Sequence, residues 1–139
     1  MADISLRSLT YVSQATVPLS DEEFRQLGSE SGRLNTVDGV TGLLVYNGDR
    51  FCQTIEGRPD VIGSLLDRLR RDGRHFNMRV TEDGPVPERR FRSWDMQLLR
   101  VPGDRAQALT QARGRLSGEA DIAARAKIYE AVAASFPDA

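Results

Sequence analysis

The feature that most constrains the fold is a β-hairpin signal in the middle of the chain. Two apolar runs, residues 42–46 and 51–55, flank Asn47-Gly48, and Asn-Gly between such runs is the strongest short-range indication of a hairpin with a type I′ turn. Because side chains alternate along a strand, Gln53 lies on the apolar face of the second run. A buried amide without partners costs about 1–3 kcal/mol, so the pattern predicts a hydrogen-bonding group on that face.

Composition and charge limit the class of protein. With 139 residues, of which 40% are hydrophobic and 28% charged, the chain is long enough for one globular domain with a substantial core. Its net charge of -1 argues against a protein whose main partner is a polyanion, although arginines cluster locally. We therefore expect no nucleic-acid partner.

Cysteine usage and the lack of long apolar runs indicate the compartment. Cys52 is the single cysteine, so an intramolecular disulfide is excluded, and no Cys/His cluster has metal-ligand spacing. Neither a charged-then-apolar leader nor an apolar run of about 18 residues is present. These features predict a cytoplasmic protein without a metal site and without membrane insertion.

The N-terminal part predicts a strand followed by a helix with an unusual inner face. Alternation over residues 6–13 puts Tyr11 on the same face as Leu9. Ser20 and Glu23 have the spacing of a capping box, so the helix should begin directly after Ser20. Its inward stripe begins with apolar residues and ends with small and polar ones: Phe24, Leu27, Gly28, Ser31, Leu34 and Asn35. A face that only packs against a core rarely has this composition.

The remaining pattern completes an α+β fold. A helical stripe over residues 62–69 begins after Pro59 and is expected to end at Asp72-Gly73, with the glycine in the left-handed conformation. Two strands follow, at residues 77–82 and 91–99, separated by residues typical of turns. The order β-α-β-β-α-β-β predicts a ferredoxin-like mixed sheet with two helices on one face.

The last part of the chain is alanine-rich and helical. Two helices are expected, near residues 104–112 and 122–136. They must cover the open face of the sheet, join another subunit, or do both, because an uncovered apolar stripe is an association surface. We divide the chain into a domain of residues 1–101 and a helical extension of residues 102–139 that caps the sheet or dimerises, and we expect a homo-oligomer.

Several unusual side chains are expected to face one interior. They are Tyr11, Ser31, Asn35 and Gln53, together with Trp94 and Met96 on the last predicted strand. Each has an ordinary explanation: a buried tyrosine usually has a satisfied hydroxyl, Trp and Met usually pack in cores, and Asn35 could cap its helix. Two amides, a hydroxyl and a phenol facing one interior are less usual, and they favour a planar ligand with amide groups held between the two helices.

Five short segments, in order and at sensible spacing, resemble one known family. They read LTYVS (9–13), NTVDGVTGLLVY (35–46), FCQTIEG (51–57), RDGRH (71–75) and RFRSWDMQ (90–97). Together they resemble the BLUF family of blue-light sensors using FAD, and the resemblance covers about residues 5–100. It implies a blue-light photoreceptor that holds FAD, with FMN or riboflavin as alternatives left open.

The resemblance also implies roles for individual residues. Tyr11 matches the phenol that donates an electron and a proton to the excited flavin, and Gln53 matches the amide between that phenol and the flavin edge. Asn35 matches the amide that pairs with the flavin C4 carbonyl and N3. Trp94 and Met96 match a pair that transmits a change at the glutamine, whether the amide rotates or tautomerises. The other implied flavin contacts are Ser31, Asp72, Arg74 and His75.

On this interpretation the chain is not an enzyme, and its output passes through an unnamed downstream protein or a change in self-association. Two alternatives remain. One is a ligand-free ferredoxin-like module that binds a protein, or a nucleic acid through the arginines of residues 68–74 or 89–92. The other is an acylphosphatase-like enzyme, although no glycine-rich phosphate loop opens the first helix. Colour separates them, because only the sensor would be yellow.

Overall fold

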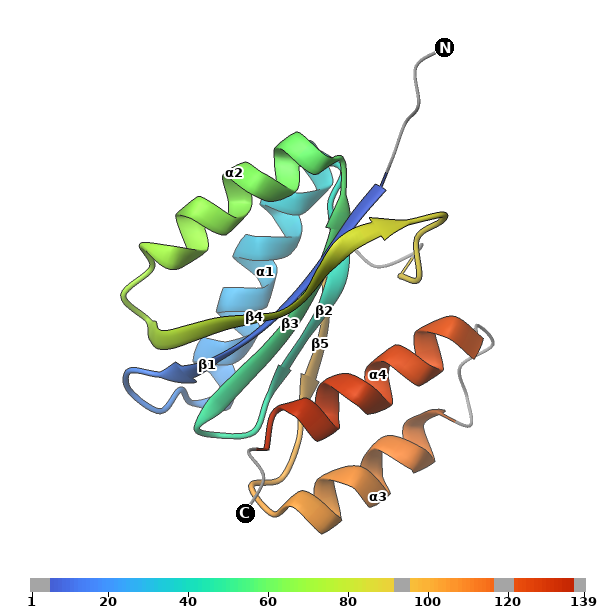
Figure 1. Ribbon diagram of the computed structural model, residues 1–139. Helices are drawn as coiled ribbons and strands as arrows, with labels where there is room; N and C mark the ends of the chain where they lie inside the picture. The colour runs from blue at the N-terminus through green and yellow to red at the C-terminus, as the bar shows by residue number, and fades with distance from the viewer. Residues whose placement is uncertain (1–5, 92–95, 117–121, 137–139) are drawn as a thin grey trace.

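Five strands form one mixed sheet in the order β4-β1-β3-β2-β5 (Figure 1). The computed structural model describes residues 6–91, 96–116 and 122–136 and, within these ranges, all side chains except those of 33–36, 113–116 and 122–125. The elements in chain order are β1 (Leu6–Ala15), α1 (Asp21–Asp38), β2 (Thr41–Tyr46), β3 (Arg50–Gly57), α2 (Pro59–Arg70), β4 (His75–Val86), β5 (Gln97–Arg100), α3 (Arg105–Leu116) and α4 (Ile122–Ala134). The predicted ferredoxin-like order of elements is confirmed.

The central hairpin is present, but its turn differs from the expected type I′. That turn needs positive φ at both central residues, whereas of Asn47 and Gly48 only the glycine has it, with φ of 96°. Asn47 instead closes a longer loop through its side chain. Its Oδ1 accepts the backbone N–H groups of Asp49 and Arg50 at 3.0 and 2.7 Å.

Helix α1 begins where the capping box predicts. The N–H of Ser20 donates to Glu23 Oε1 at 2.9 Å, and the N–H of Glu23 donates to Ser20 Oγ at 3.1 Å. The helix continues to Asp38, and Gly39 follows with φ of 71°, the left-handed residue that commonly ends a helix. Asn35 therefore lies inside α1, which excludes its explanation as a C-terminal cap.

Helix α2 starts with Pro59, as predicted, but ends differently from the expectation. The backbone N–H groups of Arg71 and Asp72 donate to the carbonyls of Arg68 and Leu69, both at 3.2 Å. These bonds tighten the last turn while the chain stays right-handed, with φ of -95° at Arg71. Gly73 is not among the residues with positive φ, so its predicted left-handed conformation is wrong.

Strand β4 is longer than predicted and forms one edge of the sheet. It pairs with β1 from Leu6 to Ala15 because two register shifts, opposite Thr10/Tyr11 and Val12/Gln14, let it follow the twist of its neighbour. Pro85, expected in a turn, pairs with Arg7 instead. Proline is tolerated there because an edge strand leaves one side without a ladder hydrogen bond.

Strand β5 is shorter than predicted and lies parallel to β2 at the other edge. It covers residues 97–100, and Phe91, the expected first residue, lies outside any strand. Met96 and Leu98 pack in the same apolar cluster, so their predicted common face is confirmed. Trp94, predicted to share that face, lies outside the described residues.

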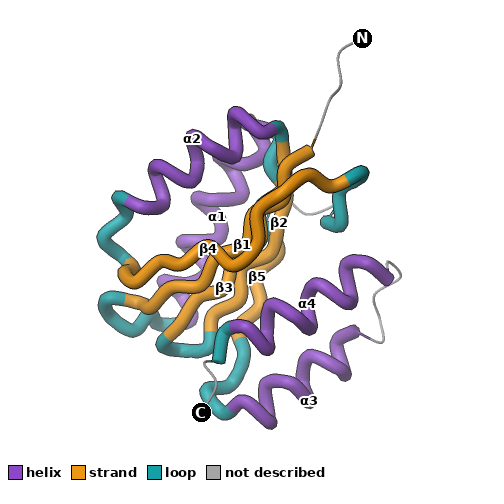
Figure 2. Tube along the Cα trace, in the orientation of Figure 1, coloured by secondary structure: helices purple, strands orange, loops and turns teal. Residues whose placement is uncertain are grey.

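The helices form layers on both faces of the sheet (Figures 1 and 2). Helices α1 and α2 cover one face, where two apolar clusters meet at Met96. Helices α3 and α4 cover the other face and bury Cys52 with Ala131 and Val132. Within the part of the chain that the structure describes, no helix is long and apolar enough to cross a membrane.

Gly28 allows α1 to approach β5 closely, which yields a stability prediction. A Cβ added at Gly28 would lie 2.6 Å from Leu98 Cγ, whereas one added at Gly32 of the same helix would meet no described atom within 4 Å. Gly28→Ala should therefore lower the free energy of unfolding by about 1–3 kcal/mol through overpacking. Gly32→Ala, the matched control, should raise it by up to about 1 kcal/mol through helix propensity. Urea denaturation measures both, and equal effects would contradict the close approach.

Candidate functional site

The site is built on one cross-strand pair in the centre of the sheet. Tyr11 of β1 lies directly opposite Gln53 of β3, so both side chains project from the same face. The Tyr11 hydroxyl donates to Gln53 Oε1 at 2.6 Å. Both residues are buried, with 3% and 5% of their surface exposed. The hydrogen-bonding group that the sequence predicted on the face of Gln53 is therefore the Tyr11 phenol.

The nitrogen of the Gln53 amide has a much weaker partner. Nε2 donates to the Met96 sulfur at 3.4 Å, and a thioether is a poor acceptor. A primary amide carries two N–H donors, and among the described residues this sulfur is the acceptor that Nε2 reaches. Gln53 is thus well satisfied at its oxygen and has donor capacity left at its nitrogen.

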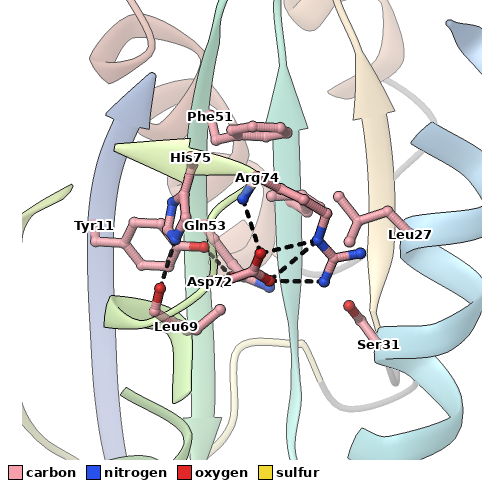
Figure 3. Close-up of a pocket in the computed structure, with 10 residues that line it drawn as sticks. Tyr11, Leu27, Ser31, Phe51, Gln53, Leu69, Asp72, Arg74 and His75 are labelled. Atoms are coloured by element: carbon pink, nitrogen blue, oxygen red, sulfur yellow. Dashed lines mark hydrogen bonds and ion pairs between the residues drawn. The ribbon is translucent and has the colours of Figure 1, made fainter. Parts of the chain in front are cut away.

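A cavity lies beside this amide, between the sheet and helices α1 and α2 (Figure 3). Its lining residues are Tyr11, Leu27, Ser31, Leu44, Phe51, Gln53, Leu69, Asp72, Arg74 and His75. Its volume is about 60 Å³, and an adjoining hollow of about 160 Å³ shares five of these residues and adds Leu65 and Arg68. Ligand pockets typically measure about 300–1,000 Å³, so a small organic molecule would fit here only if the side chains between the helices moved apart.

One side of the cavity carries an ion pair. Arg74 Nη2 lies 2.7 Å from Asp72 Oδ2, and the same guanidinium reaches Glu30 on α1 at 3.4 Å. The hydrogen bond from Arg74 holds the pKa of the Asp72 carboxyl below its usual value, although partial burial opposes this. Arg74 is half exposed, so this side of the cavity offers polar and charged groups close to solvent.

His75 lines the cavity, but both of its ring nitrogens already have partners in the protein. Nε2 lies 2.6 Å from the carbonyl oxygen of Leu69, which can only accept, so Nε2 carries the proton in the neutral ring. Nδ1 then accepts from the Ser13 hydroxyl at 2.8 Å. The ring thereby ties the C-terminal end of α2 to β1, and its centroid lies 5.8 Å from that of Tyr11.

The Tyr11 phenol is neutral in the folded protein. Burial raises its pKa well above the ordinary value, and the nearby Cys52 and Asp72 raise it further, while Arg74 opposes them. The phenol therefore keeps its proton, which points at Gln53 Oε1. A neutral donor and an amide that can reverse its polarity form the chemical centre of the site.

The structure brings together most of the predicted site residues. Besides the central pair, Ser31, Asp72, Arg74 and His75 line the cavity, and Met96 contacts the amide. The side chain of Asn35 and all of Trp94 are outside the described part of the chain. The sequence did not identify the apolar side chains that line the cavity, Leu27, Leu44, Phe51 and Leu69. It also did not identify Ser13, whose hydroxyl bonds to His75. Phe51 and Ser13 could have been found, since each lies two positions from a predicted site residue on the same strand face.

Fold and site together define a small α+β domain with a cavity beside a buried tyrosine–glutamine pair. The family model described as sensors of blue-light using FAD matches residues 6–97. The chain belongs to this family, the BLUF proteins, which bind flavin and sense blue light. The resemblance and the fold class expected from the sequence are both confirmed.

Individual relatives agree with this assignment. The photoactivated adenylate cyclase subunit beta of Euglena gracilis is 35% identical over 91 residues, which is 66% of this chain and 11% of that protein. The chain thus matches about a tenth of the length of this curated relative. The structure of BlrB, a BLUF protein in its dark state, has a TM-score of 0.70 at 34% identity and covers 95% of this chain and 98% of that one. Klebsiella pneumoniae BlrP1 with FMN and cyclic diGMP has a TM-score of 0.63 at 30% identity, over 68% of this chain and 26% of that one.

The residues of the cavity fit a flavin. Leu27, Leu44, Phe51 and Leu69 supply apolar walls for a flat ring. The unused donor capacity of Gln53 fits the ring edge, which carries carbonyl and nitrogen acceptors. The polar side around Asp72 and Arg74 suits a hydroxylated or phosphorylated side chain.

The raised pKa of Tyr11 yields a prediction for stability at high pH. A group with a raised folded-state pKa contributes its stability in full below the unfolded value, here about 10, and loses it as the pH rises above that value. Between pH 8 and 11 the native chain should therefore lose roughly 1 kcal/mol more of its free energy of unfolding than Tyr11→Phe. Urea titrations at both pH values measure the change within each protein. An equal loss in the two would show that Tyr11 titrates normally.

Proposed function

We propose that the chain senses blue light through FAD held between α1, α2 and the sheet, with Tyr11 and Gln53 as the photochemical residues. The observation that carries the proposal is the asymmetric bonding of Gln53. Its oxygen accepts a short bond of 2.6 Å from Tyr11, and its nitrogen has only a weak bond of 3.4 Å to Met96 among the described residues. Such an amide is held in one orientation by a single proton, so a change at that proton can reverse it.

The bound flavin supplies the absorption of blue light and, once excited, a site that takes up an electron. Tyr11 loses an electron, becomes strongly acidic, and releases its Oη proton along the 2.6 Å bond to Gln53 Oε1. When the electron returns, the phenol takes one proton back from Gln53. If it is the proton accepted at Oε1, the amide is restored and has only rotated; if it comes from Nε2, Oε1 keeps the first proton and Gln53 is left as the tautomer. Tautomerisation with loss of the Nε2 proton and rotation of the amide have the same consequence, because the atom facing Met96 changes from donor to acceptor.

Met96 is the proposed start of the output. Its side chain packs in both apolar clusters beneath α1 and α2, and it directly precedes β5. Loss of the Gln53 donor therefore favours another arrangement of Met96 and, through β5, of the helices beyond it. Trp94 is assigned to the same output on family resemblance alone. We propose that the signal leaves through a downstream protein or a change in self-association of a homo-oligomer.

The choice of flavin follows from the polar side of the cavity. The family description names FAD, and BlrP1 was solved with FMN, so the shared part is the ring. We propose FAD, with the ring edge toward Gln53 and Asn35 and the polar chain toward Ser31, Asp72 and Arg74. His75 is assigned to packing beside the ring, since its two nitrogens are bonded to Ser13 and Leu69.

We further propose that residues 1–101 form the photosensor, that residues 102–139 form a helical extension, and that neither part is catalytic. The cyclase relative is matched over 11% of its length, so its activity supports no enzymatic role here. Neither an acylphosphatase-like enzyme nor a ligand-free module would need a cavity beside an amide whose nitrogen has unused donor capacity. Cys52, buried and without a disulfide partner, is compatible with the proposed cytoplasmic location.

The first test is the colour and light response of the purified chain. It should be yellow, and an illuminated-minus-dark absorption spectrum should show a small red shift that decays in darkness. Tyr11→Phe should retain flavin, because Phe keeps the apolar contacts, but should lose the red-shifted product completely, because it has no phenolic proton. A normal photocycle in Tyr11→Phe would remove Tyr11 from its role, and a colourless, flavin-free chain would overturn the proposal.

The second test separates the two ends of the Gln53 amide. Gln53→Leu keeps the volume and should bind flavin without the normal shift, because no amide remains to reverse. Met96→Leu keeps the apolar packing and removes only the sulfur acceptor, so it should keep the shift and change the rate of dark recovery by up to about tenfold. Difference spectroscopy and recovery kinetics measure both. Loss of the shift in Met96→Leu but not in Gln53→Leu would contradict the proposed order of events.

A further inference from the structure

A cluster of four charged side chains lies on the sheet face opposite the flavin pocket. Arg90 Nε lies 3.0 Å from Glu56 Oε2, and Arg90 Nη2 lies 3.3 Å from Glu82 Oε1. Lys127 Nζ lies 3.4 Å from the same oxygen of Glu82. The chain of contacts therefore runs from β3 through the segment after β4, back to β4, and on to α4.

The cluster is buried to an unusual degree and its charges balance. Glu56 is fully buried, the Lys127 side chain is 4% exposed, the Arg90 side chain is 20% exposed, and the Glu82 side chain, at the solvent edge of the cluster, is 45% exposed. Lys127 is the only lysine of the chain, and lysines are almost never buried unless they are paired. Buried ion pairs add little stability compared with apolar side chains, and their best-attested use is to fix one arrangement of the parts they join.

One end of the cluster is tied to the residues that lead to Met96. Glu56 lies on β3 three positions after Gln53, on the opposite face. Its Oε1 accepts the backbone N–H groups of Arg90 and Phe91 at 2.8 and 3.2 Å. The chain is thus fixed to β3 just before the stretch that ends at Met96, the residue that contacts the Gln53 amide.

The other end of the cluster holds α4. Lys127 lies near the middle of this helix, and Ala131 and Val132, one turn further on, bury Cys52 of β3. Among the described residues, Lys127 and Glu82 form the ion pair that joins α4 to the sheet. Ala131 and Val132 of the same helix pack in the apolar cluster, and Asn47, after β2, donates to the carbonyl oxygen of Ser135 at the end of the helix at 3.0 Å. An apolar contact allows small shifts, whereas a buried lysine must stay within reach of its carboxylate partner.

We propose that Glu56, Arg90, Glu82 and Lys127 are positioning residues that couple the strand carrying Gln53 to helix α4. This inference rests on the proposed function and extends it to the output. A change at Gln53 and Met96 acts on the segment that Glu56 and Arg90 hold, and Glu82 and Lys127 pass it to α4. In this way a change at Gln53 alters the position of α4 on the other face of the sheet, although no described residue of α4 lines the pocket.

Cys52 provides a probe of this coupling. It is the single cysteine and lies fully buried beneath α4, and burial raises the pKa of its thiol to about 12. The native thiol should therefore react with Ellman's reagent at pH 8 only when α3 and α4 move away from the sheet. The labelling rate of the flavin-bound full chain is compared in darkness and under continuous blue light. We expect the two rates to differ by about fivefold or more, the lower end of typical coupling between sites.

The decisive variant is the charge-balanced double substitution Glu82→Gln/Lys127→Met. It should keep the red shift, because both residues are remote from the pocket, and its ratio of lit to dark labelling rates should fall to about 1. Lys127→Gln should behave in the same way, and Lys127→Arg should keep the ratio because it retains the charge. Asp83→Asn is the matched control. It breaks the neighbouring exposed pair with Arg7, which does not involve α4, and should leave the ratio unchanged.

The readout separates coupling from simple stabilisation. If the cluster only holds the fold together, the double variant raises both rates equally and keeps the ratio, which would overturn the inference. A ratio of 1 in the unsubstituted chain with a normal red shift would overturn it as well, while the proposed function would stand. Absence of the red shift in the unsubstituted chain would instead refute the proposed function, and the inference with it.

Discussion

The register between β1 and β3 is the constraint on which the rest of the structure depends. Tyr11 lies opposite Gln53 only because Leu9 pairs with Ile55 and Ser13 with Phe51 along the same ladder. Side chains alternate with a period of two, so a slip of one residue would turn either partner to the face covered by α3 and α4. The 2.6 Å bond between phenol and amide, and the cavity beside them, exist only in this register.

Both faces of the sheet hold that register. On the pocket side, apolar neighbours of the pair pack under α1 and α2. On the other side, the hydroxyls of Thr10 and Thr54 form a hydrogen bond of 2.8 Å. Thr10 directly precedes Tyr11, and Thr54 directly follows Gln53. A sheet buried on both faces pins its strands more firmly than one exposed to solvent, since a slip would bury unpaired polar groups. Covering the open face with α3 and α4 thus also stabilises the geometry of the Tyr11–Gln53 pair.

Local patterns predicted the parts of this fold that depend on local physics. The capping box at Ser20, Pro59 at the start of α2 and the placement of Gln53 on an inward face all follow from a few neighbouring residues. The pairing of β4 with β1 does not, because the register shifts between Phe76 and Glu82 depend on the twist of a partner distant in sequence. The same holds for the hydrogen bonds of His75, whose partners Ser13 and Leu69 are fixed by the tertiary structure. Residue types indicated the chemistry of the site, whereas the partners of each group required the tertiary structure.

The two faces of β3 carry two different groups: the amide proposed to detect light and a carboxylate of the cluster proposed to pass the change to α4. Gln53 points toward the pocket. Glu56, three positions further along β3, points to the opposite face and belongs to the charged cluster there. A strand is stiff along its length, so these groups move together when the strand or its neighbours shift. The pocket needs a dry interior in which one hydrogen bond decides the orientation of an amide, and the opposite face needs buried charges that respond to small displacements. Alternation along a single strand places both environments within about 10 Å of each other, which is consistent with the proposed coupling of detection to output.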